Sequence, residues 1–235
     1  MEKRKPNTKI TTAAGIAQYP YIDKPDGKFP KENPKDVYKV NLILEDDEKT
    51  RGQIDLMEEE RDAKHAQVLK DLKAKLKEAT PAGKKKVQKK IDALEVADVY
   101  EVHYDDAGEE TGKVILKFKM NAEVMNAKKE VFVQKPNVFD CSKPPVSLEG
   151  VAIWNGSTLK VAGEIVPYFM ESTNQVGVSL RLKAVQVIQL VGPGQADAAS
   201  YGFGEEDGGF HQEAPAGRDE FDEDDDDEAG EDDDF

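Results

Sequence analysis

Segments of two-residue alternation, separated by one long charged helical pattern, limit most strongly how this chain can fold. In residues 37–44, Tyr38, Val40, Leu42 and Leu44 share one face, and Val37, Lys39 and Asn41 lie on the other. The same period returns in residues 113–124, 158–170 and 176–191. Residues 46–79 instead lack proline and place leucines three and four positions apart, which predicts a helix that ends before Pro81. The chain therefore has to build half-buried strands around a helical insertion.

The remaining segments complete this pattern. Residues 10–23 predict an irregular first strand, residues 99–104 and 113–124 a hairpin, and residues 83–94 a second short helix. Residues 131–133 form a short extended piece. In the last hairpin, 158–170 with 176–191, Leu180 and Leu182 point inward while Arg181 and Lys183 point outward. About five antiparallel strands with one inserted helix fit a small closed barrel better than a sandwich. The charged insertion, residues 46–94, need not belong to the main core.

Charge divides the chain into two parts. Residues 205–235 hold 17 Asp and Glu against one Arg, whereas residues 1–204 carry a formal charge of +1. A run with so many like charges and few aliphatic side chains cannot bury enough surface to offset its ordering entropy. We expect a folded domain over 1–204 and a disordered acidic tail over 205–235.

Several classes of protein are disfavoured. No apolar run approaches the length of a membrane span, and the basic N-terminus leads into polar residues, so we expect neither membrane insertion nor export. The single Cys141 favours a reducing compartment. His65, His103 and His211 belong to no metal or catalytic motif, and no nucleotide-binding loop is present. The aspartates at 224–227 would bind cations only diffusely. We expect no enzyme, no cofactor and no metal site.

Basic side chains on the polar faces of the strands suggest nucleic-acid binding instead. Lys117 and Lys119 are two apart, as are Arg181 and Lys183, and Lys39 follows Lys35 at the next strand. Such a surface can follow a phosphate backbone while Tyr168 stacks on unpaired bases. Outward lysines are also ordinary solvated strand edges, and composition alone favours that interpretation. Tyr168 fits a core position equally well.

The C-terminus ends in one large apolar side chain. Phe235 follows Asp232, Asp233 and Asp234, so it has no local fold in which to be buried. It could fill a pocket on a partner while the aspartates meet a basic rim. The alternative is a solubilising tail whose last residue has no role. A tail this acidic would also compete with DNA for a basic groove.

A set of short motifs resembles the single-stranded DNA-binding proteins of T-seven-like bacteriophages. The motifs run in order over nearly the whole chain, and they are specific as a set. They are YIDKPD at 21–26, NPKDVYKV at 33–40, KFK at 117–119, LKV at 159–161, VPY at 166–168, VGVSL at 176–180, and the acidic tail that ends on Phe235.

The resemblance implies an OB-fold barrel with a protruding helix, a homodimer, and a role in phage DNA replication and recombination in the cytoplasm of the infected bacterial host. It implies coating of unwound strands, annealing of complementary strands, and tail contacts with the phage DNA polymerase and the phage primase-helicase. By position, it assigns DNA contacts to Lys35, Lys117, Lys119 and Lys160, base stacking to Tyr168, and partner binding to Phe235.

This chain departs from the family pattern at two positions. Asn121 stands where a second aromatic is expected, and Met170 stands where a tryptophan can follow. Both departures predict a thinner stacking platform. The helical insertion is also richer in lysine and aligns poorly. A rival hypothesis from another class is an acidic-tailed, chaperone-like interaction protein that does not bind DNA.

Overall fold

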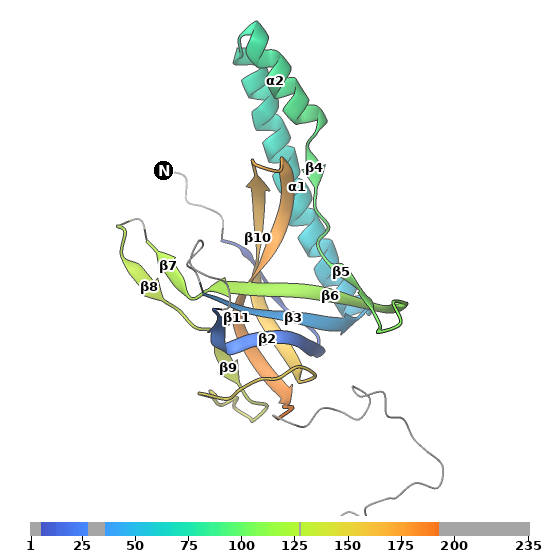
Figure 1. The fold of residues 1–235 in the computed structure, drawn as a ribbon, viewed down its shortest axis with the longest axis vertical. Coiled ribbons are helices and arrows are strands. Elements are labelled where there is room, and N and C mark those ends of the chain that lie inside the picture. The colour runs from blue at the N-terminus through green and yellow to red at the C-terminus, as the bar shows by residue number, and fades with distance from the viewer. Residues whose placement is uncertain (1–5, 28–35, 127, 193–235) are drawn as a thin grey trace, which may run out of the picture. The chain divides into compact units, whose positions relative to one another are not determined.

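The structure is a computed structural model that describes residues 6–27, 36–126 and 128–192. Strands dominate it, and two consecutive helices are inserted between the third strand and the fourth (Figure 1). The elements are β1 (Thr8–Thr11), β2 (Gly15–Asp26), β3 (Val37–Glu45), α1 (Glu48–Glu78), α2 (Pro81–Asp92), β4 (Glu95–Val96), β5 (Glu101–Tyr104), β6 (Glu110–Asn121), β7 (Glu123–Met125), β8 (Val131–Val133), β9 (Asn137–Phe139), β10 (Thr158–Met170) and β11 (Gln175–Gln189).

Five strands close on themselves. Hydrogen-bonded pairing runs from β2 to β3, β6, β11 and β10, and β10 returns to β2 at Thr158 and Leu159. The ring encloses the core, in which Phe118, Leu42, Leu116 and Leu182 are fully buried. A five-stranded ring of this kind is the arrangement of the OB-fold, so the predicted mainly β fold is confirmed. The prediction that all five strands are antiparallel was wrong, because β6 and β11 pair in parallel.

Gly163 lets the backbone of β10 lie close to β11 and to the Phe118 ring in the core. A Cβ on Gly163 would lie 2.8 Å from the carbonyl oxygen of Arg181 and 3.0 Å from the ring of Phe118. The β10–β11 register also shifts between Ala162 and Gly163. A side chain at position 163 would collide with the backbone of β11 and with the Phe118 ring, so glycine is required there.

The first half of α1 belongs to the main core, although the sequence allowed it to stand apart. The Asp47 carboxylate caps the helix by accepting a hydrogen bond from the Thr50 backbone N–H at 2.7 Å, and this bond lowers the pKa of Asp47. Ile54 and Met57 then pack into the core. The alternation of charged residues around these two positions concealed this face in the sequence.

The second half of α1 rests on the turn end of β10 and β11. Val68 and Leu72 pack with Val176 in a separate apolar cluster that Phe169 joins. In the turn, Asn174 Nδ2 donates hydrogen bonds to the carbonyl oxygens of Lys90 at 2.8 Å and Ala93 at 2.6 Å, which ties the end of α2 to the sheet. Figure 1 shows α1 running beside the hairpin and past its turn, with α2 folded back along it.

Most strand and helix predictions are confirmed. The predicted hairpin of β5 and β6 forms with a turn over residues 105–109, shorter than the expected 105–112 because β6 begins at Glu110, and β10 and β11 form the long hairpin. The irregular first strand is two strands, β1 and β2, and α2 begins two residues before the predicted 83 because Thr80 caps it and Pro81 occupies its first turn. Residues 205–235 and Lys35 lie outside the described residues. No helix in the described ranges has the length and apolar character to cross a membrane.

Candidate nucleic-acid interface

Three cations lie side by side across adjacent strands on the solvent face of the ring. Lys39 of β3 is directly opposite Lys119 of β6, and Lys119 is in turn level with Arg181 of β11. Tyr21 of β2 continues the row beyond Lys39. We call Lys39, Lys119 and Arg181 the cationic row. Like charges directly opposite each other destabilise a sheet, so the fold carries an electrostatic cost at this row.

The members of the row differ in how their charge is balanced. Lys39 Nζ lies 2.5 Å from the Asp26 carboxylate and 4.9 Å from the centre of the Tyr21 ring. Lys119 is exposed and makes no ion pair or hydrogen bond through its side chain with any residue that the structure describes. Lys119 is therefore the cation of the row most available to an added anion.

One carboxylate restrains the other end of the row. Glu164 of β10 lies 3.5 Å from Arg181 and 3.4 Å from Lys183, and its side chain is 19% exposed. Burial raises the pKa of Glu164, but the hydrogen bond from Asn7 and the charges of Lys183 and Arg181 together lower it below its usual range. Glu164 is thus ionised at neutral pH and pairs with both Arg181 and Lys183.

Beside the row the surface is hollowed into a groove of about 320 Å³, which we call the basic groove. Its charged and polar lining consists of Lys119, Asn121, Gln134, Ser179, Arg181 and Lys183. Met120, Val124 and Val166 supply the apolar part. The combination of cations, amides and apolar surface suits a strand that presents phosphates and bases together.

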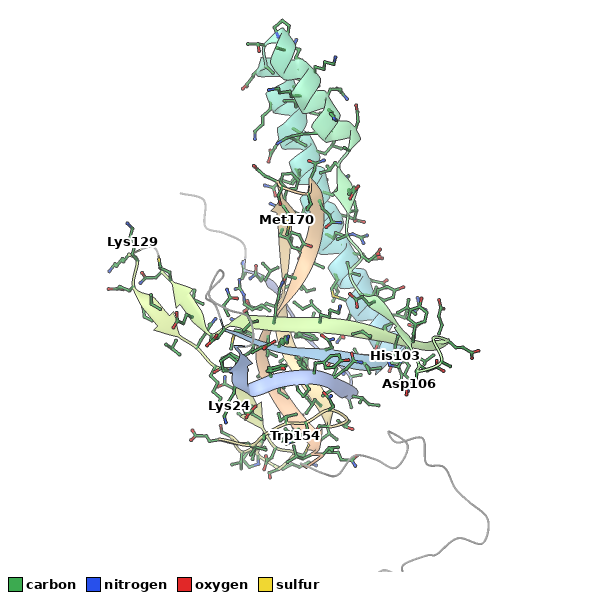
Figure 2. All side chains as sticks on the ribbon, in the orientation of Figure 1. Lys24, His103, Asp106, Lys129, Trp154 and Met170 are labelled. Carbon is green, nitrogen blue, oxygen red and sulfur yellow. The ribbon has the colours of Figure 1, made fainter. Side chains whose placement is uncertain are left out.

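The β7–β8 hairpin forms one wall of this groove. Val124 lines the groove and is paired directly with Phe132, so both side chains lie on the same face of the hairpin. Phe132 is 53% exposed. Gln134 anchors the base of the hairpin through a bond from Nε2 to the Asn121 carbonyl oxygen at 2.8 Å. Figure 2 shows Lys129 at the far end of this hairpin.

Tyr168 lies on the same outer face, two residues beyond Val166 of the groove. It is half-buried, and its ring covers Gly177, where a Cβ would lie 2.6 Å from the tyrosine hydroxyl oxygen. Phe169, the next residue, points the other way into the cluster beneath α1. Tyr168 is therefore outside the main core, and one of its ring faces is used for packing.

The other predicted residues lie at differing distances from the groove. Lys117 is two residues from Lys119 on the same face, but it is paired with Glu101. Lys160 lies at the opposite end of β10 from Tyr168, in a second depression of about 450 Å³ that includes Phe139 and Gln186. The structure thus gathers Lys39, Lys117, Lys119, Arg181 and Lys183, with Tyr168 and Lys160 towards the two ends. Lys35 and residues 232–235 lie outside the described residues.

Sequence reasoning missed Phe132 and Glu164. The segment 131–133 was predicted only as an extended piece, and the strand pairing that places Phe132 opposite Val124 is not local. The signal available for Glu164 was its position on the outer face of a strand between apolar neighbours.

The described residues contain no group of three His, Cys, Asp or Glu side chains that could hold a metal ion. His103, which belongs to no metal or catalytic motif in the sequence, faces the Thr111 hydroxyl at 2.8 Å across the β5–β6 hairpin. The chemistry gathered in the groove is that of a binding surface.

Comparison with known proteins agrees with this geometry. The family described as "Single-stranded DNA-binding protein, Bacteriophage T7" matches residues 14–190. The single-stranded DNA-binding protein of Enterobacteria phage T3 is 28% identical over 205 residues, covering 85% of this chain and 84% of the relative. That of Escherichia phage T7 is 28% identical over 204 residues, covering 84% and 79%.

The crystal structure of gp2.5, a single-stranded DNA-binding protein encoded by bacteriophage T7, superposes with a TM-score of 0.60 at 26% identity. The match covers 84% of this chain and 98% of gp2.5. The family match spans β2 to β11 and so includes every strand of the ring and the cationic row. This chain therefore belongs to the bacteriophage T7 family of single-stranded DNA-binding proteins.

Proposed function

We propose that this chain binds single-stranded DNA through the basic groove, with little sequence preference, during phage DNA replication and recombination. The observation that carries this proposal is the cationic row, in which Lys119 lacks an ion pair with any described residue and lies between two other cations. Evenly spaced cations contact a phosphate backbone whatever its sequence.

The outer face of β10 and β11 gives the extent of the proposed site. Lys160 and Tyr168 are eight residues apart on β10, which corresponds to about 26 Å of strand. With one phosphate per about 3.4 Å of a stacked strand, this length accommodates about eight nucleotides. OB folds cover about 4–16 nucleotides, so the length is reasonable for one strand.

Phe132 supplies a second aromatic surface, which the family pattern places at position 121, where this chain has Asn121. Because it shares a face with the groove-lining Val124, a base lying over Val124 meets the exposed Phe132 ring. Stacking on an aromatic tolerates every base, which fits recognition without sequence preference. We include Phe132 with Tyr168 as the two stacking residues of the site.

The finer roles follow from family membership and are proposals for this chain. They are coating of unwound strands, annealing of complementary strands, action as a homodimer, and work in the cytoplasm of the infected host. The tail, through Asp232, Asp233, Asp234 and Phe235, is proposed to contact the phage DNA polymerase and primase-helicase. A terminal aromatic beside aspartates supports this role, because it offers one apolar anchor within an anionic segment.

The test is a mobility-shift titration of the full chain with an eight-nucleotide oligo(dT), a longer oligo(dT) and a matching duplex. We expect preference for single strands and weaker binding by Lys119→Gln/Arg181→Gln. The control variant, Lys113→Gln/Arg51→Gln, removes the same charge from residues paired elsewhere with Glu45 and Asp46. Equal affinity for duplex and single strand favours the chaperone-like rival, and equal loss in both variants means that the groove is not the site.

A further inference from the structure

The near-neutral charge of residues 1–204 conceals a strongly basic arm. We use this name for residues 64–92, which comprise the second half of α1 and all of α2. Residues 64–92 hold ten lysines against Asp71, Glu78 and Asp92, a formal charge of +7. The rest of residues 1–204 therefore carries −6. The positive charge of the folded part is concentrated on one projecting element (Figure 1).

The lysines of the arm have no carboxylate partner among the residues that the structure describes. None of the ten forms an ion pair with a residue in the described ranges, and the one hydrogen bond from their ammonium groups runs from Lys64 Nζ to Gln67 Oε1 at 3.4 Å. No residue of α2 is buried. The ammonium groups therefore face solvent on both helices and are free to meet an anion.

The lysines at the start of α2 are placed against the stability of that helix. Lys84, Lys85 and Lys86 follow directly on the first turn of α2, which contains no acidic residue, so they lie near the positive end of the helix dipole. Lys85 and Lys89 are also four residues apart, where like charges repel. Lys89 and Lys90 in the last turn of α2, and Lys75 and Lys77 in the last turn of α1, lie at the favourable end of the helix dipole. An anion bound near Lys84, Lys85 and Lys86 would relieve the repulsion at the other end of α2.

A shallow groove between the two helices brings three of these charges together. Lys77 of α1 and Lys84 and Lys85 of α2 line it, with Leu76 and Gln88 between them. Gly83 lies close to the connection between the helices, where an added Cβ would lie 3.3 Å from the Ala79 side chain. The base of the arm is held by Asn174 and by the Val68 cluster, so the charges have a fixed support.

We propose that the arm binds the phosphate backbone of a second nucleic-acid strand, at a site separate from the basic groove. No large hydrophobic side chain is exposed on residues 64–92, whereas protein interfaces are enriched in aromatics and depleted in lysine. Charge without apolar anchors suits a phosphate backbone better than a protein partner. The arm rests on the turn between β10 and β11, at the Tyr168 end of the groove, so two strands can be held on one hairpin. The proposal that the arm and the basic groove hold two strands at once rests on the proposed function of the groove.

The experiment measures binding of a second strand. Full-length protein is first saturated with unlabelled eight-nucleotide oligo(dT), and a labelled oligo(dA) too short to reach both sites is then titrated at several salt concentrations. The test variant replaces Lys84, Lys85, Lys86, Lys89 and Lys90 with Gln, which has a similar helix propensity. The control replaces the same five with Arg, which keeps the charge. Circular dichroism checks that both variants keep their helices.

We expect the Gln variant to bind the second strand at least about 25-fold more weakly at 0.1 M salt than wild type, and the Arg variant to bind it normally. Two lost contacts change the salt slope by about 1.4, which gives this factor over one decade of salt. Affinity for the first oligo(dT) should not change. Unchanged binding of the second strand by the Gln variant would overturn the proposal, as would a parallel loss of both strands, which would make the arm part of a single site.

Two further outcomes separate the alternatives. If a synthetic peptide of residues 205–235 binds wild type but not the Gln variant, while the second strand binds both, the arm binds an acidic peptide and the proposal is wrong. If Lys119→Gln/Arg181→Gln binds oligo(dT) normally and only the Gln arm variant fails, the proposed function of the groove is wrong and the arm is the primary site.

Discussion

Replacing Lys119 with Gln should weaken DNA binding and stabilise the fold at the same time. Lys119 lies directly opposite Lys39 and beside Arg181, and it has no ion pair with a described residue. Removing its charge therefore relieves a repulsion in the free protein. The same change removes the most available phosphate contact of the basic groove.

Both magnitudes follow from the geometry. A directly opposed pair on an antiparallel sheet contributes about 0.2–1 kcal/mol, so the melting temperature should rise by up to about 4 °C for a domain of this size. Each phosphate contact adds about 0.7 to the salt slope of single-strand binding. If the two proteins bind equally at 1 M salt, the variant should be about fivefold weaker at 0.1 M.

Lys113→Gln is the matched control, because Lys113 lies on the same face of β6 but opposite Glu45, with which it pairs at 2.8 Å. Its loss should lower the melting temperature slightly and leave the salt slope unchanged. Fluorescence anisotropy with oligo(dT) at five salt concentrations measures the slopes, and circular dichroism measures the melts. A slope unchanged by Lys119→Gln would show that this lysine is only a solvated strand edge. A lower melting temperature would show that the row is not repulsive.

Further predictions concern the aromatic, acidic and tail residues. Phe132→Ala and Tyr168→Ala should each weaken oligo(dT) binding at least several-fold, since stacking is worth about 1–3 kcal/mol per base, and the Phe132 variant should melt like wild type in circular dichroism. Glu164→Gln should raise affinity and salt slope in anisotropy titrations by releasing two cations. Glu164→Gln should also lower the stability of the fold above pH 4.5, and it should have no such effect below the lowered pKa of Glu164. The reason is that a carboxylate with a depressed pKa contributes stability only while it is ionised. Deleting 205–235 changes the formal charge from −15 to +1 and should raise single-strand affinity most at low salt. Deleting only Phe235 should leave DNA binding unchanged and abolish polymerase binding in surface plasmon resonance.

The strands could be predicted because their signal is local. Alternation in residues 37–44 fixed which side chains of β3 are buried, and Tyr38, Val40, Leu42 and Leu44 are all buried as expected. The same period correctly turned Arg181 and Lys183 outward. A period of two is a property of the backbone itself, so it survives in any fold that buries one face of the sheet.

The site could be predicted only in part, because its assembly depends on pairing between distant strands. Lys39, Lys119 and Arg181 were chosen separately from the sequence, and nothing local indicated that they share one row. Predicting Phe132 would also have required its strand partner, since its pairing with Val124 is what places it on the groove side of the hairpin. The parallel contact of β6 with β11, which completes the row, has no sequence signature of its own.

Net charge misled the sequence reasoning for a physical reason. A near-neutral total was taken as evidence against nucleic-acid binding, yet it sums an arm of +7 and a remainder of −6. At physiological salt the Debye length is about 8 Å, so a phosphate responds to the few charges near it and hardly to the total. The 12 residues of α2 extend about 18 Å, more than two such lengths, so a strand lying along α2 responds mainly to the lysines of the arm. A chain with a formal charge of −15 can therefore present two surfaces that attract DNA, provided that its cations are gathered and its carboxylates lie elsewhere.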